Sequence, residues 1–191
     1  GGCFNYSAPR GLLYRVNVIG TKLLLETLLQ LPVVRFVFWS GAVVYGDLDR
    51  YPDKLPATEE FPVSPKDDYG WSKKEAEDWI LFFYKVFKVP VTIMRCAAIY
   101  GPNSRYGMAN AFMLQARGSL APILAGDALH NVASFIHAED VVRIADFLSH
   151  TAEANGEIYN VADRSHYSVH NVSLFVGHQL YNRPFEYIRL P

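Results

Sequence analysis

Residues 35–40, RFVFWS, and residues 89–96, VPVTIMRC, are two short and almost continuously apolar runs. Runs of this length and composition are typical of strands that lie buried on both faces inside a parallel sheet. The segment between them, residues 69–87, carries apolar side chains at helical spacing: Trp71, Ala76, Trp79, Ile80 and Phe83. The three segments therefore predict a strand, a long amphipathic helix and a second strand, the repeating unit of an α/β fold.

The same alternation of helical and strand patterns extends toward both ends of the chain. Residues 14–30 have helical spacing, and this helix is expected to end before Pro32. Further helices are expected over 108–117, 139–150 and 168–181, and further strands near 122–125, 133–137 and 157–161. Ser168 can cap the last of these helices. The whole pattern predicts an α/β fold with a doubly wound, Rossmann-type parallel sheet.

The composition is that of an ordinary globular protein. Of 191 residues, 50% are hydrophobic and 19% are charged, and the formal net charge is −1. No block of like charges occurs, so nucleic acid is not an expected partner. No apolar run reaches the roughly 18 residues of a membrane-spanning helix, and the first residues show no signal peptide. Cys3 and Cys96 form no CxxC motif, which favours two reduced thiols in a cytoplasmic protein.

Tyr69 and Lys73 are four residues apart, so they share one face of the predicted helix. A phenol titrates near ~10 in water, too high for a base at neutral pH, but a fixed neighbouring cation stabilises the phenolate. Such a tyrosine can take a proton from an alcohol as hydride leaves, or return one to a carbonyl. Taken alone, the pair is weak evidence, because many helices carry one as an exposed structural pair.

Four other motifs accompany this pair in a fixed order. They are VNVIGT at 16–21, FVFWSGAVVYG at 36–46, RCAAIYGP at 95–102 and SFIHAED at 134–140. With YGWSK at 69–73, they resemble the motifs of the extended short-chain dehydrogenase/reductases, the NAD-dependent epimerase/dehydratase family. The resemblance covers essentially the whole chain, and five ordered motifs are far more specific than one.

The resemblance implies an enzyme that uses NAD or NADP to move hydride between the nicotinamide and a secondary alcohol or ketone. Tyr69 would be the catalytic acid/base, and Lys73 would lower its pKa and bind the nicotinamide ribose. Asn17 would help to hold the geometry at a strand end as part of the cofactor site, and a side-chain cap at a helix start is an equally weighted alternative.

The segment after Arg95 is implied to face the nicotinamide and the substrate. The backbone around Ala98 and Ile99 would approach the nicotinamide carboxamide. Tyr100 and Phe112 are the expected substrate contacts.

The glycine-rich turn of dinucleotide-binding folds is missing: no GxxGxxG or GxGxxG occurs among the 13 glycines. In the family this turn lets the pyrophosphate approach a helix N-terminus. We expect the first two βαβ units, on the order of 60–70 residues, to be absent. The chain would then be a single partial dinucleotide-binding domain, with part of the small substrate-binding region from about residue 103 onward. A non-catalytic scaffold that cannot bind the dinucleotide is an alternative.

The catalytic hydroxyl expected at the end of the strand is also displaced. Gly41 occupies the position where the family has Ser or Thr, and Ser40 comes one residue earlier. Ser40 is the remaining candidate for this role. Because successive strand residues point to opposite faces, it does not automatically substitute.

The expected substrate class depends on a missing cation. Nucleotide-sugar members of the family usually carry an Arg for the diphosphate, but residues 131–135, NVASF, contain none. This favours a less charged substrate, as in the branch that resembles 3β-hydroxysteroid dehydrogenases. Arg105 and Arg117 could supply charge from neighbouring segments, so a nucleotide-sugar epimerase or dehydratase is the alternative.

Two further features have structural interpretations. His137 has no second His or Cys at ligand spacing, so we expect a structural hydrogen bond and no metal site. The aromatic residues of the helix at 69–87 are expected to pack rather than to stack on nucleic-acid bases. Their number around the helix makes a homodimer through residues 69–87 a reasonable expectation.

Overall fold

The computed structural model describes residues 2–51, 53, 55–104, 123–125, 132–168, 171–172, 175, 178–179 and 188–190. The chain divides into two compact units. The first consists of Gly1–Ala97 and Asp140–Val161, and the second of Ala98–Glu139 and Ala162–Pro191. The predicted helix at 108–117, with Phe112 and Arg117, lies outside the described residues, as does Arg105.

A three-stranded parallel sheet forms the centre of the first unit. β1 (Phe36–Gly41) pairs with β2 (Val91–Cys96), which pairs in turn with β6 (Ile158–Val161). All six residues of β2 are buried, as expected for the central strand of a parallel sheet. The strands predicted at 35–40, 89–96 and 157–161 are confirmed.

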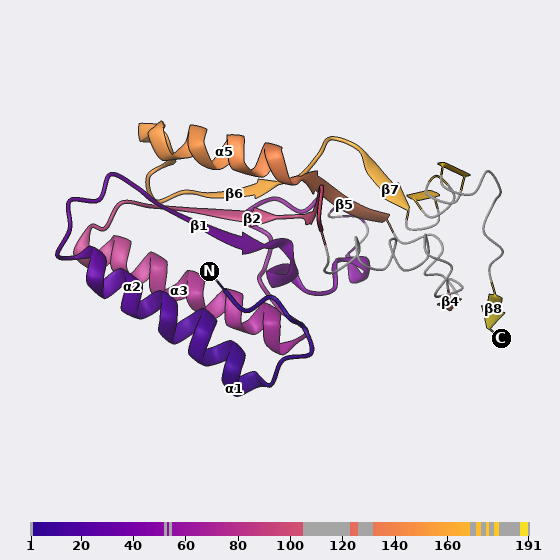
Figure 1. Ribbon diagram of the computed structural model, residues 1–191, viewed down its shortest axis with the longest axis horizontal. Coiled ribbons are helices and arrows are strands. Elements are labelled where there is room, and N and C mark those ends of the chain that lie inside the picture. Colours follow the sequence, from indigo (N-terminus) through magenta and orange to yellow (C-terminus); the bar gives the residue numbers. More distant parts are fainter. Residues whose placement is uncertain are drawn as a thin grey trace. The chain divides into compact units, whose positions relative to one another are not determined.

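Helices cover both faces of this sheet (Figure 1). On one face, α1 (Arg10–Leu13), a π-helical segment (Tyr14–Ile19) and α2 (Gly20–Leu28) form one continuous stretch that lies beside α3 (Asp68–Phe87). On the other face lies α5 (Ala138–His150). Helices on both faces of a parallel sheet make the doubly wound arrangement that the sequence predicted.

Two helix starts show how local chemistry sets the boundaries. The first helical stretch begins at Arg10, four residues before the predicted start, because Pro9 precedes it with a φ of −55° that suits a helix start. α3 begins after Asp67, whose carboxylate accepts a hydrogen bond from the Gly70 amide at 2.6 Å. Capping by a carboxylate explains why this helix starts just ahead of Tyr69.

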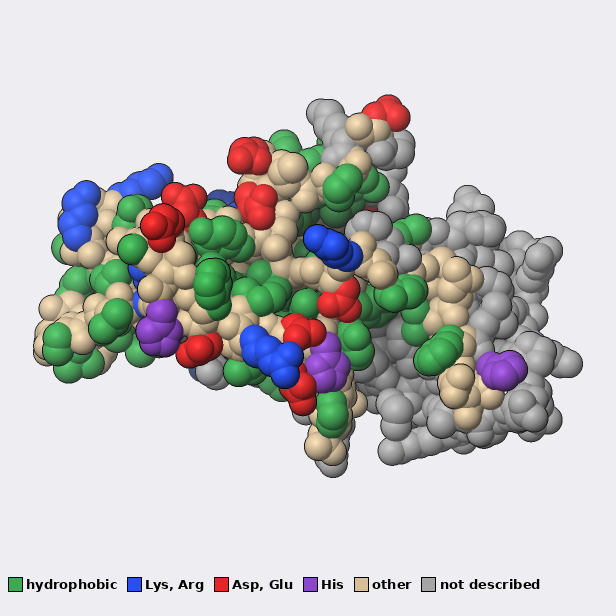
Figure 2. All heavy atoms as spheres, turned by 90° about the horizontal axis from the view of Figure 1, so that it is seen from above, with side chains coloured by type: hydrophobic (Ala, Val, Ile, Leu, Met, Phe, Trp, Pro, Cys, Tyr) green, Lys and Arg blue, Asp and Glu red, His purple; other side chains and the backbone are tan. Residues whose placement is uncertain are grey.

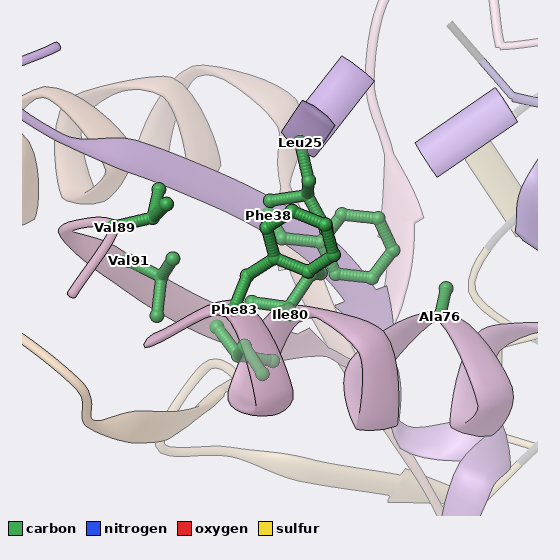
Figure 3. Packing of buried hydrophobic residues seen from close by; sticks show 8 residues of the cluster. Leu25, Phe38, Ala76, Ile80, Phe83, Val89 and Val91 are labelled. Carbon is green, nitrogen blue, oxygen red and sulfur yellow. The ribbon is translucent and has the colours of Figure 1, made fainter. Parts of the chain in front are cut away.

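The core of the first unit lies between β1, β2 and the two helices α2 and α3 (Figure 3). Its buried members are Leu25, Phe38, Ala76, Ile80, Phe83, Val89, Val91 and Ile93. The predicted stripe on α3 is confirmed for its last residues but is wrong for Trp71, which is 45% exposed. At about 100° per residue, position 71 lies well away from the face that Ala76 and Phe83 present to the sheet.

The second unit contains short strands. β3 (Ala98–Tyr100) pairs in parallel with β5 (Val132–His137), and β7 (His166–Ser168) pairs antiparallel with β5. β4 (Ile123–Ala125) pairs with β8 (Ile188–Leu190).

Ser168 shows the predicted capping contact. Its Oγ accepts a hydrogen bond from the Asn171 amide at 3.0 Å. A hydroxyl that accepts from an amide three residues later is the geometry of a helix cap.

Surface charges are mixed. Figure 2 shows the face that carries α5, where acidic, basic and apolar side chains are interspersed. In the part of the chain that the structure describes, no helix combines the length and apolar character needed to cross a bilayer.

Candidate active site

Tyr69 and Lys73 lie at the start of α3, beside the carboxyl end of β1. The Lys73 ammonium donates a hydrogen bond to the Trp39 carbonyl at 2.6 Å. Its Nζ also lies 4.4 Å from the centroid of the Phe38 ring. The helix that carries the pair is therefore tied directly to the strand end where the sequence placed the site.

The pKa of Tyr69 is raised from its ordinary value, mainly because the phenol is buried. The neighbouring Tyr6 phenol and Asp67 carboxylate raise it further. From the sequence we expected Lys73 to lower this pKa. In the structure this expectation is not met: burial raises the pKa of Tyr69, and Lys73 is not among the groups that shift it, so the phenol keeps its proton at neutral pH.

Burial acts in the opposite sense on Lys73. Removal of the ammonium from water lowers the pKa of Lys73 to about 8, although Glu77 and Cys96 favour the charged form. Burial also raises the pKa of the Cys96 thiol to about 11. Both cysteines are free thiols, and Cys96 stays protonated and unreactive at neutral pH.

Ser40 and Gly41 differ sharply in what they offer at the strand end. Ser40 is 6% exposed, and its Oγ has no hydrogen-bond partner among the described residues. It comes two residues after Phe38 along β1, so both side chains point to the face that α3 covers. Gly41 is extended, with φ −147°. A buried hydroxyl without a partner is costly in a folded protein and is expected where a ligand completes the bond.

Asn17 ties the first residues of the chain to α3. Its Oδ1 accepts from the Cys3 amide at 2.8 Å, and its Nδ2 donates to the Cys3 carbonyl and the Ser72 hydroxyl, both at 2.9 Å. Ser72 in turn donates to the Tyr69 carbonyl at 2.7 Å. Asn17 lies in the middle of a helical stretch, so the alternative of a helix-start cap is wrong. Asn17 lies in the π-helical segment, and its side-chain amide bonds residues that are distant in sequence.

A buried polar network fixes α3 against the sheet. The Arg95 guanidinium on β2 donates to the Glu77 carboxylate on α3, with the shortest contact 2.8 Å. It also donates to the Tyr45 hydroxyl at 3.0 Å, and that hydroxyl donates to the Asn160 side chain at 2.7 Å. The Glu59 carboxylate accepts a hydrogen bond from the backbone N–H of Asn160 at 2.7 Å. The network joins α3, β2, β6 and the loop that follows β1.

Gly46 makes the turn after β1 possible. It has φ +73°, and a Cβ at this position would lie 1.9 Å from the Ser64 carbonyl oxygen. Only glycine fits this close approach, which directs the backbone past Tyr45 into the network.

The predicted contacts at 98–100 belong to the second unit. Ala98, Ile99 and Tyr100 form β3, and the Tyr100 ring lies 5.2 Å from the ring of His137. Their roles toward the nicotinamide and the substrate stay predictions. Phe112 lies outside the described residues.

His137 makes a structural hydrogen bond, as predicted. Its Nδ1 accepts from the Glu139 amide at 3.3 Å. Over the described ranges, no cluster of His, Cys, Asp or Glu could hold a metal ion.

Sequence reasoning missed Tyr6 and the buried ion pair. The Tyr6 and Tyr69 ring centroids are 4.5 Å apart. No local pattern marks Tyr6, since it lies 63 residues before its neighbour. Arg95 left a signal that could have been followed, because it is a charged residue in an otherwise apolar strand, whereas Glu77 lies in the charged stretch KKEAED at 73–78.

A parallel sheet with helices on both faces defines a Rossmann-type fold, and Tyr69 and Lys73 lie at the start of α3 beside the end of β1. The family described as "NAD dependent epimerase/dehydratase family" matches residues 1–162. The chain belongs to this family of enzymes, as its motifs indicated.

Named relatives agree with this membership. The chain is 27% identical to a putative UDP-glucose 4-epimerase of Methanocaldococcus jannaschii, over 86% of this chain and 53% of the relative. It is 31% identical to the UDP-glucose 4-epimerase of Vibrio cholerae, over 81% of this chain and 46% of the relative. The chain thus spans about half the length of these curated relatives.

A solved structure shows the same fold. The dTDP-glucose 4,6-dehydratase of Bacillus anthracis, determined in complex with NAD, is 28% identical with a TM-score of 0.79. The match covers 97% of this chain and 59% of that chain.

Proposed function

We propose that this protein is an NAD-dependent epimerase of nucleotide sugars, in which Tyr69 shuttles a proton at the carbon that exchanges hydride. The observation that carries the proposal is the placement of Tyr69 and Lys73 at the carboxyl end of β1, in a chain of the epimerase/dehydratase family. The sequence favoured a less charged, steroid-like substrate. The relatives support the nucleotide-sugar alternative better, because they are named for UDP-glucose and dTDP-glucose.

The residues present suit the nicotinamide end of a dinucleotide. Lys73 uses one of its three N–H donors on the Trp39 carbonyl, which leaves donors for the hydroxyls of a ribose. When bound, the nicotinamide supplies the group that accepts and returns hydride. The Ser40 hydroxyl, buried without a partner, is available to donate to the reacting oxygen.

Tyr69 can serve in both directions of such a reaction. Because its pKa is raised, the phenol is protonated at neutral pH and can donate to the oxygen of a keto sugar. A positive charge brought beside the phenol lowers its pKa and lets it accept the sugar hydroxyl proton. Oxidised nicotinamide carries such a charge.

Epimerisation is favoured over dehydration by the groups near Tyr69. Epimerisation returns hydride and proton to the atoms from which they came, so one acid/base is enough. Elimination of water needs a further group that protonates the leaving hydroxyl. The two carboxylates that precede Tyr69 already have partners: Asp68 lies 3.8 Å from the Arg10 guanidinium, and Asp67 caps α3 through the Gly70 amide.

Incubation of the natural protein with NAD and UDP-glucose, followed by chromatography of the nucleotide sugars, tests the proposal. We expect conversion to the 4-epimer and thermal stabilisation by UDP. A ligand held at 100 times its Kd adds about 2.7 kcal/mol of stability, which melting detects. Formation of a 4-keto-6-deoxy sugar from dTDP-glucose would instead identify a dehydratase. Indifference to UDP, dTDP and NAD alike would leave the scaffold alternative.

We also propose that a second copy of this chain is a partner, bound through the outer face of α3. Trp71, Phe82 and Val86 follow helical spacing on this face and are each about half exposed. Burial of such a stripe against its own copy would remove a large apolar surface from water. Sedimentation velocity should show a dimer that Phe82→Glu converts to monomer, and a monomeric wild type would contradict this.

A further inference from the structure

The ring of Tyr6 covers the ring of Tyr69. The two centroids are 4.5 Å apart, with the planes tilted by 50°. This lies at the short end of the range for aromatic pairs that attract each other. Tyr6 itself is 55% exposed, so one part of its ring contacts Tyr69 while the rest faces solvent.

The segment that carries Tyr6 is held at both ends. On one side, Asn17 binds both the amide and the carbonyl of Cys3. On the other side, the Ala8 amide donates to the Asn5 carbonyl at 3.0 Å, which closes a turn around Tyr6 just before the first helix. The backbone that carries Tyr6 is therefore held by hydrogen bonds on both sides, independently of the contact between the two rings.

The same residues fix the other half of the pair. Asn17 also donates to Ser72, and Ser72 donates to the carbonyl of Tyr69. The buried Asn17 side chain thus helps to hold the backbone of both segments, the one near Tyr6 directly and the one at Tyr69 through Ser72. A 4.5 Å ring contact whose backbone is held in this way has a defined geometry, and a defined geometry is what a binding site requires.

Both phenols stay neutral at neutral pH. Burial and the Asp67 carboxylate raise the pKa of Tyr6, and burial raises that of Tyr69. A neutral aromatic ring with an exposed apolar face, fixed against a catalytic phenol, suits the C–H face of a pyranose.

We propose that Tyr6 is a specificity-determining residue: its ring forms the outer wall of the site and receives the pyranose whose hydroxyl reacts with Tyr69. This rests on the proposed function. The wall limits which sugar rings reach the Tyr69 phenol, and it shields that phenol from water.

The test compares Tyr6→Ala and Tyr6→Phe with Tyr14→Ala in the natural protein. Tyr14 is 46% exposed and lies in the helical stretch that follows Tyr6 in the sequence, so it is a matched control for loss of a half-exposed tyrosine. Tyr6→Ala should raise the KM for the nucleotide sugar roughly tenfold, the loss of an aromatic contact worth about 1.4 kcal/mol. The KM for NAD should stay unchanged. Tyr6→Phe keeps the ring and should stay within about twofold of wild type.

A second measurement needs no substrate. Tetranitromethane nitrates accessible tyrosines, and peptide mapping gives the rate at Tyr69. Removal of the covering ring should speed nitration of Tyr69 in Tyr6→Ala and leave it unchanged in Tyr14→Ala. An unchanged nitration rate in Tyr6→Ala overturns the proposal even if no nucleotide sugar is turned over. If the wild type is active, an unchanged KM in that variant overturns it as well. If only the proposed function is wrong, the protein will convert no nucleotide sugar, but Tyr6→Ala will still speed nitration of Tyr69.

Discussion

Replacement of Glu77 by glutamine should lower the free energy of unfolding by about 3–5 kcal/mol, because it leaves the Arg95 guanidinium buried without its counter-ion. The side chains of Arg95 and Glu77 are only 5% and 3% exposed. Water therefore cannot replace the lost carboxylate. Urea unfolding of wild type and variant, followed by circular dichroism, gives the difference.

A surface pair on the same helix provides the control. Lys74 and Asp78 form an ion pair on α3, and the Asp78 side chain is 55% exposed. Asp78→Asn should change the free energy of unfolding by less than about 0.5 kcal/mol, since water and salt screen exposed pairs. The double variant Glu77→Met with Arg95→Met should be more stable than Glu77→Gln, because it buries no unpaired charge. A Glu77→Gln protein as stable as Asp78→Asn would show that the ion pair contributes nothing.

Replacement of Tyr69 by phenylalanine should reduce kcat by roughly 10²- to 10⁴-fold, the usual contribution of a positioned acid/base. Phenylalanine keeps the ring that packs against Tyr6, so only the hydroxyl is lost. The hydrogen bond from the Ser72 hydroxyl to the Tyr69 carbonyl is also kept. The KM for NAD and the melting temperature should therefore stay close to those of the wild type. The measurement is the initial rate of epimer formation at saturating substrate.

Tyr14→Phe is the matched control for Tyr69→Phe and should keep full activity. The pH dependence adds a second criterion. Because burial raises the pKa of Tyr69 from its ordinary value, the phenol is the proton donor across the neutral range. Raising the pH toward 9 should not restore the Tyr69→Phe rate, since no other group is expected to replace the phenol. Turnover within about threefold of the wild type would remove Tyr69 from the mechanism.

Residues close in sequence account for most of what could be predicted about the fold. The apolar runs at 35–40 and 89–96 form strands, and the pattern at 69–87 forms one helix. These predictions succeed because helix and strand periods decide which side chains a segment can bury. The boundaries were less accurate, because Pro9 and Asp67 set helix starts through single capping positions.

The sequence by itself also determined that Tyr69 and Lys73 share a face, since four residues make about one helical turn. The tertiary structure decided what that face contacts. Lys73 reaches the Trp39 carbonyl, 34 residues away, and burial sets the direction of both pKa shifts. Packing of α3 on β1 decided that Ser40 lies buried on the face of the sheet that α3 covers.

The largest differences involve contacts between distant segments. The bonds from Asn17 to Ser72 and from Arg95 to Glu77 span 55 and 18 residues, and Tyr6 meets Tyr69 only after the chain folds. A local pattern records how each segment buries its own apolar face. Such a pattern does not indicate which polar group of another segment a given residue will contact, because that depends on how the sheet and the helices pack. The sequence therefore determined the elements and the reactive pair, and only the tertiary structure decided the surroundings that tune that pair.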